Sequence, residues 1–306
     1  MRTFIRTVIG MWAMLAPTAA WAAGHDWLAG IDGSTRLSQI SIPGTHNSGA
    51  TQESWPGTAK CQNLTIADQL NLGVRLLDIR CRHIDDAFAI HHGPVFQGLS
   101  FRDVLDQVTG FLNANPRECV LMSVKEEFTD SGNTRSFEAT FDSYVAARPA
   151  SWWLGSGVPT LDSVRGKIVL LRRFAATATQ GIDATHWPDN TRFDANHLSV
   201  QDDYQVSDAA NKWRQVSAAL DAAHADTRGD VLHLTFTSGY LTGLLGVPRI
   251  PELADQINPK LEKFFTPDRS GHFGIVLMDF ADANRCRMIW QTNFPKPAAA
   301  AAGGHP

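Results

Sequence analysis

Two histidine-bearing segments of the chain have the surroundings that acid–base chemistry requires. Residues 42–49, IPGTHNSG, place His46 in a turn bracketed by glycines, where the freedom of the backbone lets an imidazole project into a cavity. Residues 90–94, IHHGP, carry two adjacent histidines, and neighbouring side chains on an extended chain point to opposite sides. Only one of His91 and His92 can therefore face the same cavity as His46.

An arginine lies between these histidines in a segment of alternating polarity. In residues 77–82, LDIRCR, the two-residue period of a strand puts Asp78, Arg80 and Arg82 on one face. Two imidazoles with a guanidinium suit the cleavage of a phosphodiester. One ring takes a proton from the attacking hydroxyl, the other protonates the leaving oxygen, and the guanidinium holds the phosphate oxygens in a bidentate fashion. An unperturbed imidazole titrates near neutrality, so both protonation states are accessible.

Polar or ionisable residues also end most of the expected strands. Short apolar runs alternate with longer amphipathic segments, a pattern typical of repeated β/α units around a parallel sheet. In such a barrel the carboxyl ends of the strands converge on one mouth, and that mouth carries the active site. The following residues are therefore expected to meet there: His46, Arg80, Lys125, Arg173, Asp202 and Asp279.

The chain is predicted to fold as one α/β domain, a distorted TIM-type (β/α) barrel that is irregular or incompletely closed. Its length suits one barrel better than two ordinary domains. Strands are expected at residues 38–42, 74–82, 119–125, 168–173, 198–202, 231–237 and 274–279. Helices are expected at residues 100–114, 134–147 and 209–224.

The two ends of the chain differ from the rest. Residues 1–22 combine a basic start, an apolar run and a small-residue cleavage site, which indicates a secretory signal peptide. A membrane anchor would need about 20 unbroken apolar residues, and Pro17 interrupts the run. We therefore expect a secreted or periplasmic protein, with residues 23–294 forming the catalytic barrel and residues 295–306 a disordered tail.

Charge and cysteine content narrow the classes of partner. The formal net charge is −4 at pH 7, whereas nucleic-acid recognition usually shows as a strongly basic face, so no nucleic acid is expected. In an exported chain, Cys61, Cys81, Cys119 and Cys286 are expected to form one or two disulfides, and their spacing is not that of a zinc site. We favour a pair between Cys61 and Cys81, since both flank the expected active-site strands.

The chain resembles the bacterial phosphatidylinositol-specific phospholipase C family from about residue 41 to residue 280. The matching stretches follow the family's order at similar spacings: IPGTHNSG, GVRLLDIRCR, HHGP, LMSVKEE, RGKIVLLRRF, HWPDN, VQDDY and FTS. Any one of them alone would be weak evidence, but the ordered set is specific. The family's fold is a distorted β/α barrel, in agreement with the strand pattern.

The resemblance implies cleavage of phosphatidylinositol or of a glycosylated relative. His46 would deprotonate the inositol 2-hydroxyl, which attacks the phosphorus and releases diacylglycerol, leaving inositol 1,2-cyclic phosphate. His92 would protonate the diacylglycerol oxygen, Arg80 would neutralise the phosphate, and Asp279 would orient His46. The remaining matched positions are Lys125, Arg173, Asp202 and Tyr204 around the inositol, Trp187 at the rim and Asp78 beside the arginine.

One position departs from the family. Metal-independent members usually carry aspartate after the first histidine, where this chain has Asn47, and calcium-dependent relatives share the His-Asn pair. We count Asn47 among the catalytic residues because its amide can accept hydrogen bonds from guanidinium. Arg80 and Lys125 occupy positions where acidic metal ligands would be expected, and their charges repel a metal ion, so no metal and no other cofactor is expected.

Two other functions stay open on this evidence. One is a metal-dependent barrel phosphodiesterase that acts on another phospholipid. The other is a non-catalytic module that binds inositol phosphate or a membrane, although binding alone needs neither histidine nor Asp279. Trp55 and residues 239–247, GYLTGLLGV, are apolar and are expected to contact a phosphatidylinositol-containing membrane. The protein is expected to be a monomer.

Overall fold

A parallel sheet curls into an open barrel at the centre of the molecule. The computed structural model describes residues 24–243 and 246–294 of the chain. The parallel strands follow the order β7 (Ile168–Arg173), β5 (Val120–Glu126), β2 (Leu76–Ile84), β1 (Ile42–Thr45), β15 (Ile275–Met278), β12 (Leu232–Phe236) and β10 (Leu198–Gln201). Within the described residues β7 and β10 do not pair with each other, so the prediction of an incompletely closed α/β barrel is confirmed.

The strand predictions agree with the structure except at the first strand. The later six are within two residues of the observed bounds. The prediction of a strand at residues 38–42 is wrong, because Leu37–Gln39 forms a 3-10 helix and β1 begins at Ile42. Pro43 lies inside β1. The Pro43 carbonyl accepts a hydrogen bond from the Arg75 N–H, on the side where β2 has not yet begun, so the missing N–H of proline costs no ladder bond there.

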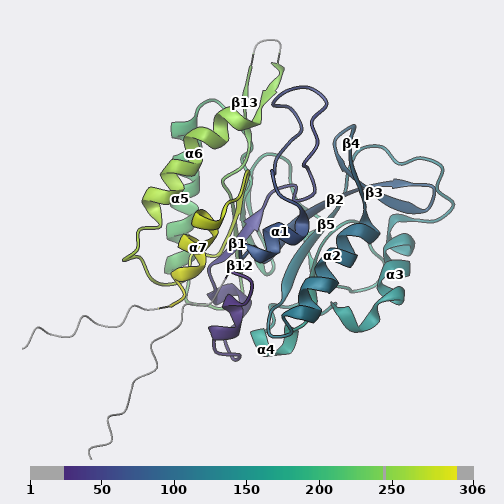
Figure 1. Cartoon of the computed structure of the whole chain (residues 1–306), viewed down its shortest axis with the longest axis horizontal. Helices are drawn as coiled ribbons and strands as arrows, with labels where there is room; N and C mark the ends of the chain where they lie inside the picture. The colour runs from purple at the N-terminus through teal and green to yellow at the C-terminus, as the bar shows by residue number, and fades with distance from the viewer. Residues whose placement is uncertain (1–23, 244–245, 295–306) are drawn as a thin grey trace, which may run out of the picture.

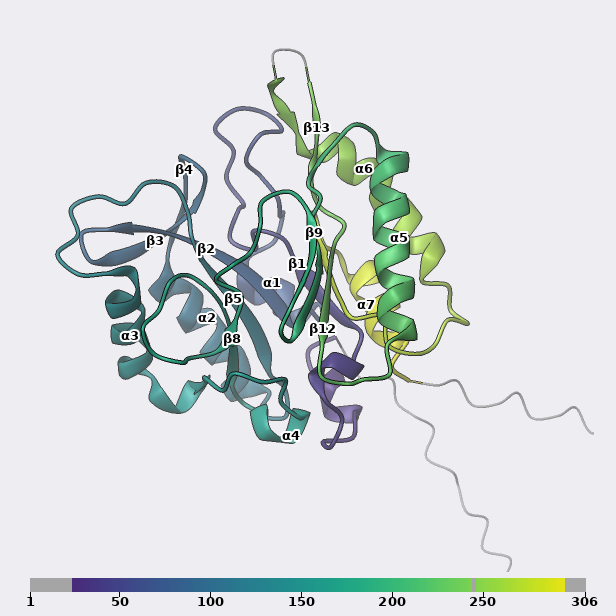
Figure 2. The ribbon, with the colours of Figure 1, turned by 180° about the vertical axis from the view of Figure 1, so that it is seen from behind.

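Helices cover the outside of the sheet in two groups (Figures 1 and 2). On one side lie α1 (Ile66–Asn71), α2 (Phe101–Ala114), α3 (Phe137–Ala147) and α4 (Leu161–Val164), and on the other lie α5 (Ala209–Ala225), α6 (Ile250–Phe264) and α7 (Ala283–Gln291). The three predicted helices are confirmed. The expected start of α3 at residue 134 was too early, because Ser136 caps this helix by accepting the Ala139 N–H. Among the described helices, none has the length and hydropathy that a membrane crossing requires.

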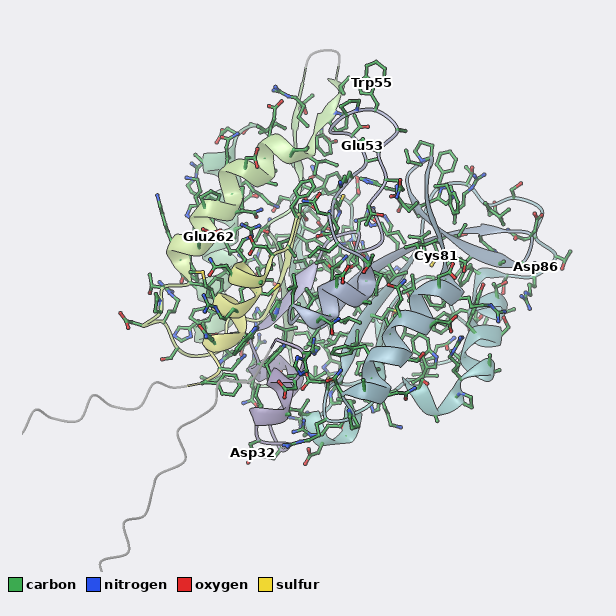
Figure 3. The ribbon with its side chains drawn as sticks, viewed as in Figure 1. Asp32, Glu53, Trp55, Cys81, Asp86 and Glu262 are labelled. Carbon is green, nitrogen blue, oxygen red and sulfur yellow. The ribbon has the colours of Figure 1, made fainter. Side chains whose placement is uncertain are left out.

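Shorter strands extend the sheet and build up the mouth of the barrel. The hairpin of β3 (Ala87–His92) and β4 (Val95–Ser100) continues from β2. A second small sheet joins β11 (Gln205–Val206), β13 (Tyr240–Thr242) and β14 (Pro248–Arg249). Figure 3 shows the loop with Glu53 and Trp55 at the same end of the molecule as β13. The remaining short elements are β6 (Trp152–Trp153), β8 (Ile182–Asp183), β9 (Arg192–Ala195), and the 3-10 helices Trp27–Gly30 and Pro149–Ser151.

The sheet separates two large hydrophobic clusters. One cluster fills the interior of the barrel and includes Leu76 of β2 and Leu121 of β5. The other lies between the sheet and the helices and includes Leu77 and Ile79. Successive residues of a strand therefore belong to different clusters, as the two-residue period requires. The interior of the barrel is a packed apolar core, and it becomes polar only at the carboxyl ends of the strands.

The cysteines do not form the expected disulfide. Cys61, Cys81, Cys119 and Cys286 are all buried and free. The predicted pairing of Cys61 with Cys81 fails because the two side chains pack in different hydrophobic clusters, Cys61 with Ala50 and Cys81 in the cluster under the helices. The predicted signal peptide at residues 1–22, the predicted tail at residues 295–306, and the two leucines of the loop at residues 244–245 lie outside the described residues.

Candidate active site

The inward-facing side chains of the strands change from apolar to ionisable toward the carboxyl ends. In β2 the inward series begins with Leu76 and continues with Asp78 and Arg80, and in β7 it ends on Arg173. The core positions stabilise the sheet by burial. Because side chains two residues apart share a face, the last inward position of each strand lies at the mouth. The same rule brings Lys125 to the mouth from β5.

These side chains line one cavity of about 430 Å³ at the mouth. Most of the predicted site residues line it: His46, Arg80, His92, Lys125, Arg173, Trp187, Asp202 and Tyr204. Three others, Asn47, Asp78 and Asp279, are at most 1% exposed and lie among the buried residues. The structure thus brings together side chains from β2, β3, β5 and β7 and from the loops that follow β1, β8, β10 and β15.

The two histidines are each held through Nδ1. His46 Nδ1 lies 2.8 Å from Asp279 Oδ1, and His92 Nδ1 lies 2.7 Å from the Ala59 carbonyl oxygen. Since a carboxylate and a carbonyl only accept, both Nδ1 atoms donate, and each Nε2 is left for chemistry. The ring centroids are 6.3 Å apart and the rings are nearly perpendicular. Burial and the Arg80 charge lower the pKa of His92.

The adjacent His91 faces away from this pair. Its Nδ1 lies 3.3 Å from the Gly93 carbonyl oxygen, and its ring packs on Phe96. The expectation that only one of the two adjacent histidines can face the mouth is confirmed, and the residue that does so is His92.

Arg80 is fixed between two carboxylates. Its Nε donates to Asp78 Oδ2 at 3.1 Å, and its Nη1 lies 3.9 Å from Glu127 Oε2. Glu127 Oε2 also forms an ion pair with Lys125 Nζ, at 3.3 Å. Although burial opposes it, the charges of Arg80 and Lys125 lower the pKa of Glu127 to about 2. Burial would raise the pKa of Asp78, but the charges of Arg80 and Arg173 outweigh burial and lower this pKa. The two carboxylates hold the Arg80 guanidinium in place at the cavity, where its N–H groups can donate to an anion.

Aromatic and acidic side chains form the opposite wall. The Arg173 guanidinium lies 3.8 Å from the centroid of the Trp187 ring, and Trp187 Nε1 donates to Asp202 Oδ2 at 3.0 Å. Tyr204 Oη donates to the Asp189 carboxylate at 2.8 Å. Since β10 ends at Gln201, Asp202 and Tyr204 follow the strand and lie in the segment that leads to β11. This wall offers flat rings and fixed hydrogen-bonding groups to a polyhydroxylated ring.

Asn47 contributes through its backbone. Its φ of 39° lies in the left-handed region, which asparagine tolerates, and its N–H donates to Asp78 Oδ2 at 3.0 Å. Neither polar atom of its side chain has a hydrogen-bond partner among the described residues. The expected hydrogen bond from the Arg80 guanidinium to the Asn47 amide is therefore absent there, because Asp78 accepts from that guanidinium.

Some residues of the cavity were not anticipated. Glu127 accepts from the Gly93 N–H at 2.9 Å and so ties the turn after His92 to the Arg80 network. The inward period of β5, extended two residues past Lys125, could have found it. Asp189 lies in a loop, where no periodicity indicates which way a side chain points.

One group of side chains in the described part of the chain has the spacing of metal ligands. His46, Cys61 and Asp279 offer ligand atoms that all lie within 4.8 Å of one another. This nitrogen, sulfur and oxygen set does not match calcium, which prefers six to eight oxygen ligands.

Known proteins of similar sequence cover nearly the whole chain. Residues 34–174 match the family described as "Phosphatidylinositol-specific phospholipase C, X domain". The 1-phosphatidylinositol phosphodiesterase of Listeria monocytogenes is 30% identical over 281 residues, which cover 87% of this chain and 84% of that protein. The 1-phosphatidylinositol phosphodiesterase of Staphylococcus aureus strain Newman is 30% identical over 280 residues, which cover 84% of this chain and 88% of that protein.

Solved structures show the same architecture. A variant of the phosphatidylinositol-specific phospholipase C from Staphylococcus aureus has a TM-score of 0.81 at 28% identity, covering 90% of this chain and 98% of that one. The phosphatidylinositol-specific phospholipase C from Listeria monocytogenes has a TM-score of 0.75 at 26% identity, covering 89% and 99%. Since a relative that is 30% identical covers 87% of this chain, and a solved structure of the same kind covers 90% of it, the chain belongs to the phosphatidylinositol-specific phospholipase C family.

Proposed function

We propose that the protein is a phospholipase C that cleaves phosphatidylinositol by acid–base catalysis. The observation that carries this proposal is the pair of histidines in one cavity, each with Nδ1 engaged and Nε2 left for proton transfer, beside a fixed arginine. The relatives that share the barrel are 1-phosphatidylinositol phosphodiesterases by name. A glycosylated phosphatidylinositol is a second substrate of the same chemistry.

The first step transfers two protons. His46 Nε2 takes the proton of the inositol 2-hydroxyl, and that oxygen attacks the phosphorus. The bond from phosphorus to the diacylglycerol oxygen breaks, and protonated His92 gives its Nε2 proton to the leaving oxygen. The products are diacylglycerol and inositol 1,2-cyclic phosphate. In a slower second step the roles reverse: His92 activates water, and His46 protonates the 2-oxygen as the ring opens.

The charged residues stabilise the phosphate through these steps. Arg80 faces the cavity while Asp78 and Glu127 hold it, so its charge is oriented before the substrate arrives. Lys125 adds a second positive charge. Because burial and Arg80 lower the pKa of His92, the free acid gives up its proton easily. The bound phosphate anion offsets that effect by attracting the imidazolium.

The opposite wall suits the inositol ring. Arg173 and Asp202 offer donors and acceptors to its hydroxyls, and the Tyr204 ring gives the sugar a flat surface. Trp187 holds both charged groups, by stacking on Arg173 and by donating to Asp202. Asp189, through the Tyr204 hydroxyl, fixes the angle of the tyrosine.

The mouth of the barrel is also the surface that we propose meets the membrane. Trp55 is 68% exposed and Val247 is 36% exposed, although both are large apolar side chains. The Ile250 N–H donates to the Gly57 carbonyl at 3.0 Å, so the loop with Trp55 is joined to the end of the hairpin that carries Val247. Apolar groups beside the cavity would enter the lipid interface where the substrate lies. We further propose export through residues 1–22 and action as a monomer.

The test is phosphorus NMR of the reaction with phosphatidylinositol vesicles in excess EDTA. We expect a cyclic phosphate to appear first and to disappear later. His46→Ala and His92→Ala are each expected to lose at least about a hundredfold in rate. His91→Gln is the matched control, since that histidine adjoins His92 but faces away, and it is expected to keep its activity. Inositol phosphate monoester as the first product would contradict the proposal. So would full activity in His46→Ala or in His92→Ala.

The same experiment addresses the alternative functions. A binding module would give vesicle association without any turnover. A metal-dependent phosphodiesterase would be inactive in EDTA and would become active after a divalent ion is added in excess.

A further inference from the structure

Cys61 lies beside both histidines of the site, behind the cavity lining, although the proposed mechanism gives it no role. It is fully buried, and its Sγ lies 3.7 Å from His92 Nδ1 and 3.7 Å from the Ala59 carbonyl oxygen. Its sulfur also lies within 4.8 Å of a ring nitrogen of His46 and of a carboxylate oxygen of Asp279. Three different donor types therefore lie close together, and one of them is the ring of the proposed base, His46.

The backbone holds this arrangement in place. The Cys61 N–H donates to the Ala50 carbonyl at 2.9 Å, and the Phe280 N–H donates to the Cys61 carbonyl at 2.8 Å. Gln62 Nε2 donates to the carbonyls of His46 and Met278, each at 2.9 Å. The segment with Cys61 is thus clamped between the end of β1 and the end of β15. The donor atoms are positioned before any ligand arrives, which lowers the entropy cost of binding.

We propose that His46, Cys61 and Asp279 form a binding site for zinc, and that an ion bound there switches the enzyme off. Imidazole nitrogen, thiolate sulfur and carboxylate oxygen are the donors that zinc takes in proteins. Three protein ligands leave a fourth tetrahedral position for water. This inference goes beyond the proposed function, because it concerns an ion that the reaction does not need.

The donor types favour zinc over calcium, and the charges favour a divalent ion. One thiolate and one carboxylate cancel both charges of the ion, so the occupied site is neutral although Arg80 is near. Without metal, burial and the Asp279 carboxylate raise the pKa of the Cys61 thiol, which stays protonated. On binding, the ion displaces that proton, which passes to solvent.

Occupation removes the base from the reaction. In the unbound enzyme His46 Nδ1 donates to Asp279 Oδ1 at 2.8 Å. An ion that takes the Asp279 oxygen and a His46 nitrogen breaks this hydrogen bond, and it also withdraws the ring from proton transfer. The ion reaches the site through the cavity, because the His46 side chain is 12% exposed there.

The experiment uses zinc chloride as inhibitor and cobalt chloride as a spectroscopic probe. Zinc is expected to inhibit the wild-type enzyme, and EDTA is expected to restore activity. Cys61→Ala is expected to keep its activity and to need at least about tenfold more zinc for the same inhibition. Cys81→Ala, which removes a buried free thiol from another cluster, is the matched control and is expected to respond like the wild type.

Cobalt gives a readout that needs no turnover. Wild-type protein with cobalt is expected to show the near-ultraviolet band of a cobalt–thiolate bond, and Cys61→Ala is expected to lack it. Zinc that inhibits Cys61→Ala as strongly as the wild type would overturn the proposal, and so would a wild type without the cobalt band. If phosphatidylinositol is not the substrate, the cobalt band still tests the site. If Cys61→Ala fails to fold, the band of the wild type and its displacement by zinc decide the question.

Discussion

Replacing Asp279 by asparagine tests how much the buried carboxylate contributes to the reaction. Asp279 is 1% exposed, its Oδ1 lies 2.8 Å from His46 Nδ1, and its Oδ2 accepts from the Gly239 N–H at 3.4 Å. In the proposed mechanism His46 becomes an imidazolium when it takes the proton of the substrate, and the carboxylate stabilises that charge. Two opposite unit charges roughly 4 Å apart attract by about 4 kcal/mol at an effective dielectric constant of 20.

This energy sets the expected size of the effect. With about 1.4 kcal/mol per factor of ten, Asp279→Asn is expected to lower kcat roughly a thousandfold. KM is expected to change little, because the Asp279 side chain is buried behind the cavity lining. The assay measures initial rates on phosphatidylinositol in detergent micelles, at several substrate concentrations, and melting temperature serves as the check on folding.

Asp189→Asn is the matched control for this prediction. Asp189 lines the cavity, and its carboxylate accepts from the Tyr204 hydroxyl and not from a histidine. We expect this variant to raise KM and to keep kcat within about tenfold, since no proton transfer depends on it. If Asp279→Asn keeps more than about a tenth of the wild-type kcat with an unchanged melting temperature, the carboxylate does not support the base, and the reasoning is refuted.

Three further predictions follow from other charges. Wild-type enzyme is expected to keep its activity in excess EDTA because Arg80 supplies the positive charge at the phosphate; loss in EDTA and recovery with calcium would contradict this. In the proposed mechanism His92 must be protonated, and burial and the Arg80 charge lower its pKa below the ordinary 6.5. As pH rises, kcat/KM is therefore expected to begin its fall at a pH below 6.5. Glu127→Gln removes a charge that raises this pKa, so the fall should begin at lower pH, and a shift upward would show that the acid is misassigned. Burial lowers the pKa of Lys212 from 10.5 to about 8. Between about pH 8 and pH 10.5 this lysine is therefore protonated in the unfolded chain and neutral in the folded protein. The free energy of unfolding should therefore rise by up to about 3 kcal/mol across that range, and urea titrations of Lys212→Met should show a smaller rise.

The sequence predicted the parts of the site that strand geometry controls. The two-residue period carries Arg80, Lys125 and Arg173 to the mouth, whatever the loops do. It did not predict the contacts of the loops, since these depend on tertiary structure. The turn that presents the Ala59 carbonyl to His92 is built around the Glu53 carboxylate, which accepts the Ala59 N–H at 2.7 Å.

Positions whose role is carried by the backbone were also out of reach of the sequence. Asn47 reads as an amide ready to accept from a guanidinium, yet it is the N–H of this residue that makes the contact, with Asp78. Nothing in a residue type shows which of its polar atoms will find a partner. The pairing expected between Cys61 and Cys81 failed for a similar reason, because closeness to the same strands does not determine which cluster a side chain enters.

The wall proposed to bind the inositol lies at the open side of the barrel, where, in the part of the chain that the structure describes, side chains alone join the two edges of the sheet. Between β7 and β10 the described residues form no strand pair, and side chains join the two edges: Arg173 stacks on Trp187, and Trp187 donates to Asp202. These two contacts are worth on the order of 3 kcal/mol. No backbone hydrogen bond of a strand pair reinforces these contacts among the described residues. An inositol that carries a glycan needs an outlet for the rest of the chain, and the seam is where the wall yields at least cost.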